Sequence, residues 1–301
     1  MGHGIAQIFA QARFHVSLYD ISDAILENAL SRISQNLDML IEESSINEQI
    51  KVSTLEKIST TTNLVEAVEG SSFVIEAVSE KLNIKFQLFK QLEEVVTDDI
   101  VIASNTSTFS IQQLAEGLQK SDRLIITHFF NPAHLVPLVE VVKGPNTPQV
   151  MIENTVEMLK KIGKQPIVLK KGLPGLIANR LQAALVREAF YLLENDIADA
   201  KDIDLAITAG PGFRWAFIGP LETADFGGLD IWKSVVENLS PLLSKEEKIP
   251  ASIEEKIQCG QLGTKTGSGL FQYCGEDEVE NKLRERDANF IRLGKIKNKP
   301  L

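Results

Sequence analysis

The chain has 301 residues, of which 44% are hydrophobic and 24% charged, and its formal net charge at pH 7 is −10. This composition is ordinary for a globular protein of two domains, and the acidic balance argues against non-specific binding of nucleic acid. The sequence shows neither an apolar run of membrane-spanning length nor a secretory signal, so we expect a cytoplasmic protein without a membrane contact.

Strand and helix patterns alternate in the first half of the chain. Short apolar or alternating runs predict strands, and longer segments with an apolar stripe predict helices. The expected strands cover residues 15–19, 57–61, 73–78, 100–103, 124–129 and 138–142, and the expected helices cover residues 22–42, 82–96 and 111–118. Such alternation predicts an α/β domain with a doubly wound, Rossmann-like parallel sheet and helices on both faces.

After residues 170–175 the pattern becomes helical. Helices are expected over residues 176–194, 201–209, 230–239 and 279–293, the last ending at Gly294. We therefore expect two domains, residues 1–171 and 172–301, the second all-α. Its first helix is apolar nearly all round, which predicts a place at the domain centre, in a subunit contact, or in both, and we favour both. Cys259 and Cys274 lack metal-ligand spacing, so no metal site is expected.

His128 is the first candidate for catalysis. It lies at or near the end of an apolar strand, the turn signal Asn131-Pro132 follows, and Glu140 lies in the next expected strand. An imidazole titrates near neutral pH and is suited to take the proton of an alcohol, while a carboxylate on its other nitrogen fixes the tautomer. A hydrogen-bonded core histidine is the competing interpretation, and Glu140 is either a solvent-facing residue or a buried charge that needs a partner.

Asp20 directly follows the strand expected over residues 15–19. In a dinucleotide fold, an acidic residue at this place accepts hydrogen bonds from the adenine ribose hydroxyls, and its charge repels a 2′-phosphate. The alternative is a helix cap, because Asp20, Ser22 and Asp23 all precede the next helix.

Together these patterns resemble the L-3-hydroxyacyl-CoA dehydrogenase family over nearly the whole chain. The matching segments are residues 1–7 (MGHGIAQ), 104–107 (SNTS), 128–132 (HFFNP) with Glu140, 174–180 (PGLIANR), 219–222 (GPLE) with Asp225, and 263–267 (GTKTG). Their order and spacing make a chance match negligible. The resemblance implies a Rossmann-like NAD-binding domain followed by a helical domain that binds substrate and forms a homodimer.

The resemblance also implies a role for single residues. His128 is the general base and Glu140 its partner, while Ser107 and Asn179 contact the substrate. For NAD, the implied contacts are Gly2, Asp20, Glu80, Lys85, Asn131 and Lys265. Competing structural roles are a helix cap for Ser107, a structural hydrogen bond for Asn179, and a surface salt bridge between Glu80 and Lys85.

The implied reaction is hydride transfer between NAD and the 3-hydroxyl or 3-keto position of a short-chain L-3-hydroxyacyl-CoA, as in fatty-acid metabolism. Residues 225–230 (DFGGLD) favour this acyl-CoA branch, whereas residues 212–220 (GFRWAFIGP) are more similar to relatives acting on L-gulonate or L-carnitine and to the λ-crystallins. Arg214 in that segment is either a carboxylate clamp or a structural residue. No basic cluster for the CoA phosphates is evident near residues 36–43. A crystallin-like binding protein is the non-enzyme alternative.

The N-terminus departs from the family pattern. Relatives open with a strand and a G-x-G-x-x-G phosphate loop, of which only the final glycine, Gly2, has a counterpart. Arg13 also stands where relatives commonly have glycine. We expect an N-terminally incomplete gene product that starts at an internal Met and binds NAD poorly. Loss of a central strand is expected to leave unpaired edges on its two neighbours.

Overall fold

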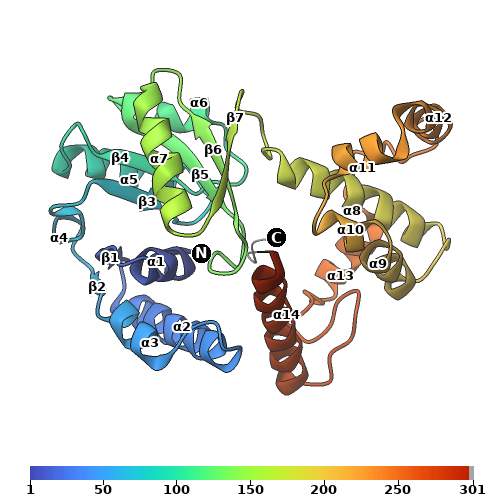
Figure 1. Cartoon of the computed structure of the whole chain (residues 1–301), viewed down its shortest axis with the longest axis horizontal. Helices are drawn as coiled ribbons and strands as arrows, with labels where there is room; N and C mark the ends of the chain where they lie inside the picture. Colours follow the sequence, from blue (N-terminus) through green and yellow to red (C-terminus); the bar gives the residue numbers. More distant parts are fainter. Residues whose placement is uncertain (298–301) are drawn as a thin grey trace. The chain divides into compact units, whose positions relative to one another are not determined.

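The computed structural model describes residues 1–297 (Figure 1). The chain divides into two compact units: the first comprises Met1–Asn179 and the described residues from Asp287 onward, and the second comprises Arg180–Arg286. Strands covered by helices form the first unit, and helices joined by loops form the second. The predicted fold class, a Rossmann-like sheet followed by an all-α domain, is confirmed.

The elements of the first unit follow one another as an alternating series. They are α1 (Gly2–Gln11), β1 (Val16–Tyr19), α2 (Asp23–Glu42), α3 (Glu48–Leu55), β2 (Ile58–Thr61), α4 (Leu64–Val68), β3 (Phe73–Glu76), α5 (Leu82–Val95), β4 (Val101–Ser104), α6 (Ile111–Ala115), a short 3₁₀ helix (Ser121–Arg123), β5 (Leu124–Phe129), β6 (Leu138–Lys143), α7 (Gln149–Lys161) and β7 (Gln165–Leu169). The six predicted strands are confirmed as β1 to β6. Helices α1, α3, α4 and α7 and strand β7 were not anticipated.

The larger sheet has five strands in the order β3-β4-β5-β6-β7. Most neighbours are parallel, but β5 and β6 run antiparallel, which corrects the expectation of an entirely parallel sheet. The connection between them, residues 130–137, is too short to hold the crossover that parallel neighbours need. This hairpin places residues of β5 directly opposite residues of β6.

Two apolar clusters cover the two faces of this sheet. One contains Phe89 of α5 with Ile126 of β5, and the other contains Phe9 of α1 with Ile125 of β5. Neighbouring residues of β5 belong to different clusters because successive side chains of a strand point to opposite faces. Every residue of β5 is buried, so His128 lies near the end of a strand enclosed on both sides.

Strands β1 and β2 form a separate parallel pair, and β1 does not pair with β3 in the described structure. A cavity of about 780 Å³ is lined by Val16–Tyr19 from β1 and by Phe73–Glu76 from β3. The edges of β1 and β3 that line it are unpaired, as expected from the sequence.

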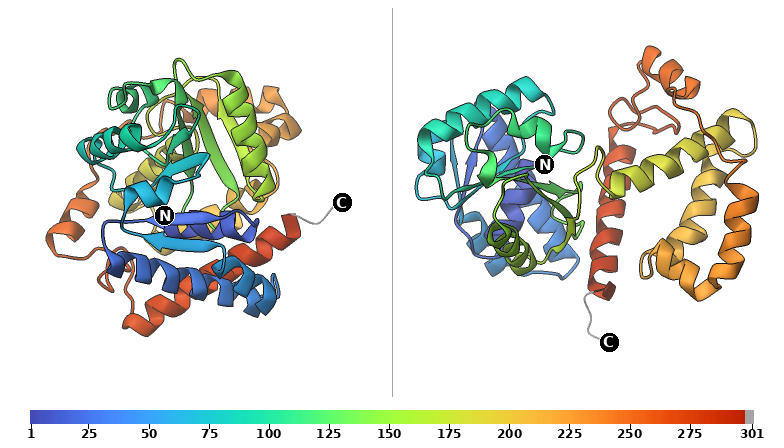
Figure 2. Two further views of the ribbon diagram at one scale, coloured as in Figure 1. Left: turned by 90° about the vertical axis from the view of Figure 1, so that its left-hand side faces the viewer. Right: turned by 90° about the horizontal axis from the view of Figure 1, so that it is seen from above.

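Helix α8 (Ala178–Glu194) begins at the end of the first unit and continues into the second, which also contains α9 (Ala200–Ala209), α10 (Pro211–Trp215), α11 (Pro220–Gly227), α12 (Leu229–Leu239) and α13 (Ala251–Gln258) (Figures 1 and 2). Helix α14 (Glu276–Lys297) leads back into the first unit. Helix α14 does not end at Gly294 as predicted, because one glycine in a helix costs only about 1 kcal/mol. Helix α8 has no buried residue, so a place at the domain centre is wrong. Among residues 1–297, no helix is long and apolar enough to span a membrane.

Candidate active site

His128 and Glu140 form a buried pair at the end of the β5–β6 hairpin. The antiparallel register sets the two residues opposite each other, which brings their side chains onto the same face of the sheet. His128 Nδ1 lies 2.9 Å from Glu140 Oε2, and the two residues are 5% and 0% exposed. Glu140 is therefore a buried, paired charge and not a solvent-facing strand residue.

The second oxygen of Glu140 binds the start of helix α8. Glu140 Oε1 accepts hydrogen bonds from the backbone N–H groups of Ile177 and Ala178 at 2.8 and 3.0 Å. Burial raises the pKa of Glu140, but hydrogen bonds from His128 and these two N–H groups outweigh it and hold the pKa below its ordinary value. An ionised Glu140 requires the proton of His128 to be on Nδ1, which leaves Nε2 as the base.

The loop of residues 105–109, here named the Ser107 loop, follows β4 beside this pair. Asn105 Oδ1 accepts a hydrogen bond of 2.9 Å from the backbone N–H of Phe129, the neighbour of His128. Ser107 is half-buried and does not cap α6, because Ser110 forms the capping box with Gln113. The competing role of Ser107 as a helix cap is therefore wrong.

Asn179 lies in the first turn of α8, next to Ala178. Since the N–H group of Ala178 is held by Glu140, Asn179 is anchored close to the His128–Glu140 pair, and it is half-buried. Lys265 belongs to the helical unit, where it is exposed, and Asn131 is exposed just after β5. Their contacts with a cofactor remain proposals.

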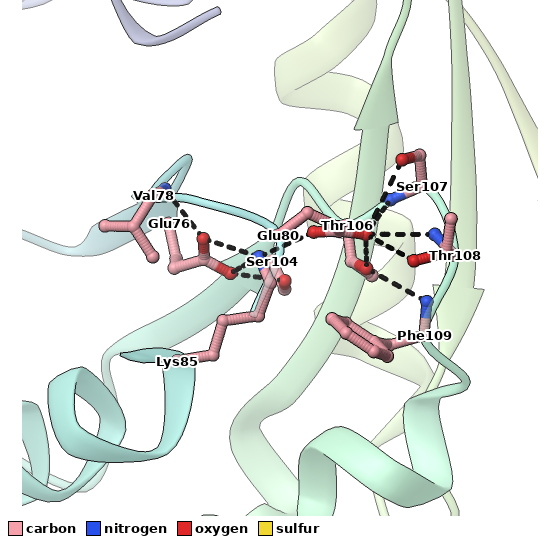
Figure 3. A network of polar contacts seen from close by, with 9 residues as sticks. All are labelled: Glu76, Val78, Glu80, Lys85, Ser104, Thr106, Ser107, Thr108 and Phe109. Carbon is pink, nitrogen blue, oxygen red and sulfur yellow. Dashed lines mark hydrogen bonds and ion pairs between the residues drawn. The ribbon is translucent and has the colours of Figure 1, made fainter. Parts of the chain in front are cut away.

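A buried ionic cluster lies at the carboxyl ends of β3 and β4 (Figure 3). Lys85 Nζ lies 2.8 Å from both oxygens of Glu76 and 3.1 Å from Glu80 Oε2. Glu76 also accepts hydrogen bonds from Ser104 Oγ at 2.5 Å and from the backbone N–H of Val78 at 2.8 Å. Lys85 is 1% exposed, so a surface salt bridge does not describe it, and its contact with a cofactor stays a proposal. Its ion pair with Glu80 joins a buried ammonium to a carboxylate whose side chain is 32% exposed.

Glu76 was missed by sequence reasoning. Its position offered a signal, because it is the acidic last residue of an apolar strand and α5 begins shortly afterwards. A carboxylate at that place needs a cationic partner when the strand end is buried. Lys85, one turn into α5, supplies this partner.

Gly2 and Asp20 line the cavity between β1 and β3, together with Ala77 and Val78. A Cβ atom on Gly2 would lie 3.9 Å from the Cβ of Ala77, which places the first turn of α1 against the end of β3. The N-cap residue of α2 is Ser22, and no side-chain hydrogen bond caps this helix. Neither Asp20 nor Ser22 therefore caps it through its side chain. The contacts of Asp20 with the ribose and of Gly2 with the diphosphate of a dinucleotide stay predictions.

Acid should weaken the fold through Glu80. Burial raises the pKa of this residue, but hydrogen bonds from Thr106, the charge and hydrogen bond of Lys85, and the N–H of Ser107 lower it to about 2. The stabilisation is present above the ordinary pKa of 4.5 and is lost as the pH falls from 4.5 toward 2. Urea unfolding gives the free energy of unfolding of the native protein and of Glu80→Gln. The native protein should be the more stable of the two at pH 6, and the difference should be smaller near pH 3. An equal difference at both pH values would contradict the assignment.

A dinucleotide-type sheet, an acidic residue after β1 and a buried His–Glu pair at a strand end define an NAD-linked oxidoreductase. The chain belongs to the 3-hydroxyacyl-CoA dehydrogenase family. Residues 1–172 match the model described as "3-hydroxyacyl-CoA dehydrogenase, NAD binding domain", and residues 175–273 match the C-terminal domain of the same family. The cofactor is therefore NAD.

Relatives and solved structures of several activities are similar to this chain. The λ-crystallin homolog of Homo sapiens is 38% identical, with 99% of this chain and 93% of that protein covered. The mitochondrial hydroxyacyl-coenzyme A dehydrogenase of Sus scrofa is 35% identical, with 91% and 88% covered. The crystal structure of 5-formyl-3-hydroxy-2-methylpyridine 4-carboxylic acid 5-dehydrogenase is 30% identical, covers 100% of this chain and 96% of that one, and gives a TM-score of 0.92.

Proposed function

We propose that this protein transfers hydride between NAD and the 3-hydroxyl or 3-keto position of a short-chain L-3-hydroxyacyl-CoA. The observation that carries the proposal is the His128–Glu140 pair, joined at 2.9 Å at the end of β5. The likeness to a hydroxyacyl-coenzyme A dehydrogenase supports the choice of substrate. The fatty-acid pathway supplies substrates of this kind.

In this mechanism, bound NAD supplies the hydride acceptor. His128 Nε2 takes the proton of the substrate hydroxyl as the carbon-bound hydrogen leaves with its electron pair, and the product is a ketone. Glu140 stabilises the imidazolium that forms on His128, because its carboxylate already accepts the Nδ1 proton. Ser107 and Asn179 bind the substrate oxygen. In the reverse direction, His128 returns the proton.

A second candidate is a small hydroxy acid without CoA. The helical hairpin of α2 and α3 is rich in acidic residues, and the carboxylate of Glu43 just after α2 is held by Arg292 from α14 at 2.6 and 3.0 Å. This surface repels the phosphates of CoA more than it attracts them. The exposed Arg214 on α10 offers a bidentate partner for a substrate carboxylate.

The test follows nicotinamide absorbance with acetoacetyl-CoA and NADH, and in parallel with L-gulonate or L-carnitine and NAD. Turnover of acetoacetyl-CoA with the highest kcat/KM would support the proposal. Preference for a hydroxy acid would favour the second candidate. A folded full-length chain that turns over none of the three would favour a crystallin-like binding role and contradict both.

We expect Asp20→Ala to relax the discrimination between NAD and NADP. The carboxylate weakens the binding of NADP by repelling its 2′-phosphate, and it strengthens the binding of NAD through hydrogen bonds to the ribose hydroxyls. Its loss should therefore weaken the binding of NAD and strengthen that of NADP. The ratio of kcat/KM for NAD over NADP should fall, with kcat at saturating NAD nearly unchanged. A native protein that already prefers NADP would make the ribose assignment wrong.

We also propose that the protein is a homodimer through its helical unit. Large apolar side chains are exposed along α10 to α12 and beyond, among them Phe213, Leu221, Phe226, Leu229 and Leu242. Extended apolar patches are uncommon on monomers and mark contact surfaces. A second copy of the chain is the partner that the symmetry of most oligomers favours.

The double variant Leu221→Asp/Phe226→Asp should be monomeric in solution. Both side chains are strongly exposed, at 85% and 73%, so the change removes apolar contact area without disturbing the interior of the unit. Light scattering at several concentrations gives the mass. Val150→Asp is the matched control, because Val150 is an exposed apolar residue on α7 of the first unit. A native chain that is monomeric, or a double variant that stays dimeric, would contradict this surface.

A further inference from the structure

The carboxylate of Glu80 connects the buried ionic cluster to the Ser107 loop. Its Oε2 pairs with Lys85 at 3.1 Å, and its Oε1 accepts hydrogen bonds from the loop on the opposite side (Figure 3). These bonds come from Thr106 Oγ1 at 2.5 Å, the N–H of Ser107 at 2.9 Å, and the N–H and Oγ1 of Thr108 at 3.0 and 2.9 Å. One carboxylate therefore holds three consecutive residues of the loop.

The hydroxyl of Ser107 is the weakest of these contacts. Its Oγ lies 3.5 Å from Glu80 Oε1, at the outer limit of a hydrogen bond, while closer donors already occupy that oxygen. The loop backbone is clamped, and the hydroxyl of Ser107 retains its capacity to bind another group. Thr106 reinforces the clamp, because its Oγ1 accepts the N–H of Phe109 at 3.1 Å.

Stability alone does not explain this cluster. Two carboxylates, those of Glu76 and Glu80, share the ammonium of Lys85. Apolar residues of similar volume would often stabilise a fold as much as a buried ion pair does, or more. The fixed position of Lys85 holds Glu80 Oε2, which leaves Oε1 directed at the loop. The arrangement is suited to hold a loop in one conformation.

We propose that Glu80 is a positioning residue that acts through Ser107, holding the Ser107 loop so that the hydroxyl of Ser107 is directed at the substrate oxygen. The inference rests on the proposed function, in which Ser107 binds that oxygen. It differs from the role as a cofactor contact that the family resemblance implies for Glu80. The two roles predict different kinetic changes.

A double-mutant cycle with Ser107→Ala separates them. Glu80→Ala should lower kcat by about 10- to 100-fold, since small misplacement of a binding group is costly, while the Kd of NADH from fluorescence titration stays within about twofold. In the Ser107→Ala background, Glu80→Ala should change kcat by no more than about twofold, because the residue through which it acts is already removed. A raised Kd for NADH with kcat unchanged, or losses that multiply in the double variant, would overturn the proposal.

Glu93 on α5, the helix that begins just after Glu80, provides a matched control. Its carboxylate accepts the backbone N–H groups of Gln119 and Lys120 at 2.9 and 2.8 Å, so it also holds a loop, but one without a candidate site residue. Glu93→Ala should lose stability and keep its kcat. If Glu80→Ala fails to fold, Glu80→Gln, which keeps the volume and one acceptor oxygen, should show a smaller loss of kcat with the same non-additivity. An additive Glu80→Gln would reject the role.

A readout independent of turnover keeps the two hypotheses distinct. Amide hydrogen exchange should be faster for residues 106–109 in Glu80→Ala than in the native protein, and unchanged there in Glu93→Ala. Unaltered exchange in this segment would show that Glu80 does not hold the loop. Faster exchange in a protein whose native form turns over no substrate would instead reject the proposed function and leave the clamp in place.

Discussion

Replacing His128 by Gln is expected to lower kcat by about 10²- to 10⁴-fold, the contribution typical of a general base. The imidazole is the one group at the end of β5 placed to take a proton, since its Nδ1 is engaged with Glu140 and its Nε2 is the basic nitrogen. The amide of Gln keeps a hydrogen bond to Glu140 but has no basic atom. Steady-state kinetics at saturating cofactor and substrate gives the change in kcat.

The same variant should bind NADH with nearly native affinity, because the residues assigned to the ribose and diphosphate lie along β1 and α1. Circular dichroism and fluorescence titration serve as controls for folding and for the cofactor. A variant that retains native turnover would remove His128 from the mechanism. One that loses turnover together with NADH binding would point to a general disruption of the first unit.

Replacing Glu140 gives the second large effect, and comparison of two variants separates its part in the rate from its part in stability. Glu140→Ala leaves the Nδ1 of His128 and the N–H groups of Ile177 and Ala178 without an acceptor inside the protein. Each buried donor left without a partner costs about 1–3 kcal/mol of folding free energy. Urea unfolding measures this loss, and kcat should fall together with it.

Glu140→Gln is the informative partner of that variant. An amide has a single acceptor oxygen, so if this oxygen binds Ile177 and Ala178, the NH₂ group faces His128 Nδ1. The imidazole must then accept at Nδ1 and carry its proton on Nε2, which is the wrong tautomer for a base. Stability should largely return, while kcat stays at least about 10²-fold below the native value. Recovery of both would show that the charge of Glu140 is not needed.

The sequence predicts the parts of this site that neighbouring segments build. His128 and Glu140 lie on adjacent strands joined by a short turn, so a strand pattern with a turn signal is enough to place them near each other. The bonds of Glu140 to Ile177 and Ala178 escape such reasoning, because they depend on how the chain packs after β7. A local pattern contains no information about that packing.

Lys85 shows a different limit. A lysine and a glutamate near the start of a helix are usually a solvated surface pair, since fully buried charges are rare. Here the end of β3 supplies a third charged group, Glu76, which pairs with Lys85 inside the fold, while Glu80 binds the same ammonium from the surface. Among the elements that were not anticipated, helices α3 and α4 and strand β7 have brief patterns, and tertiary contacts stabilise such short elements.

The two oxygens of Glu140 make the alignment of the base conditional on the chain that leads into α8. Gly175 and Leu176, which precede Ile177 and the helix, have positive φ angles of 76° and 54°, and the next two N–H groups donate to Oε1. If the turn at Gly175 and Leu176 opens, the carboxylate loses its anchor on one side and can swing away from the imidazole on the other. We therefore expect a substitution that opens this turn to lower kcat, although it touches neither His128 nor the substrate.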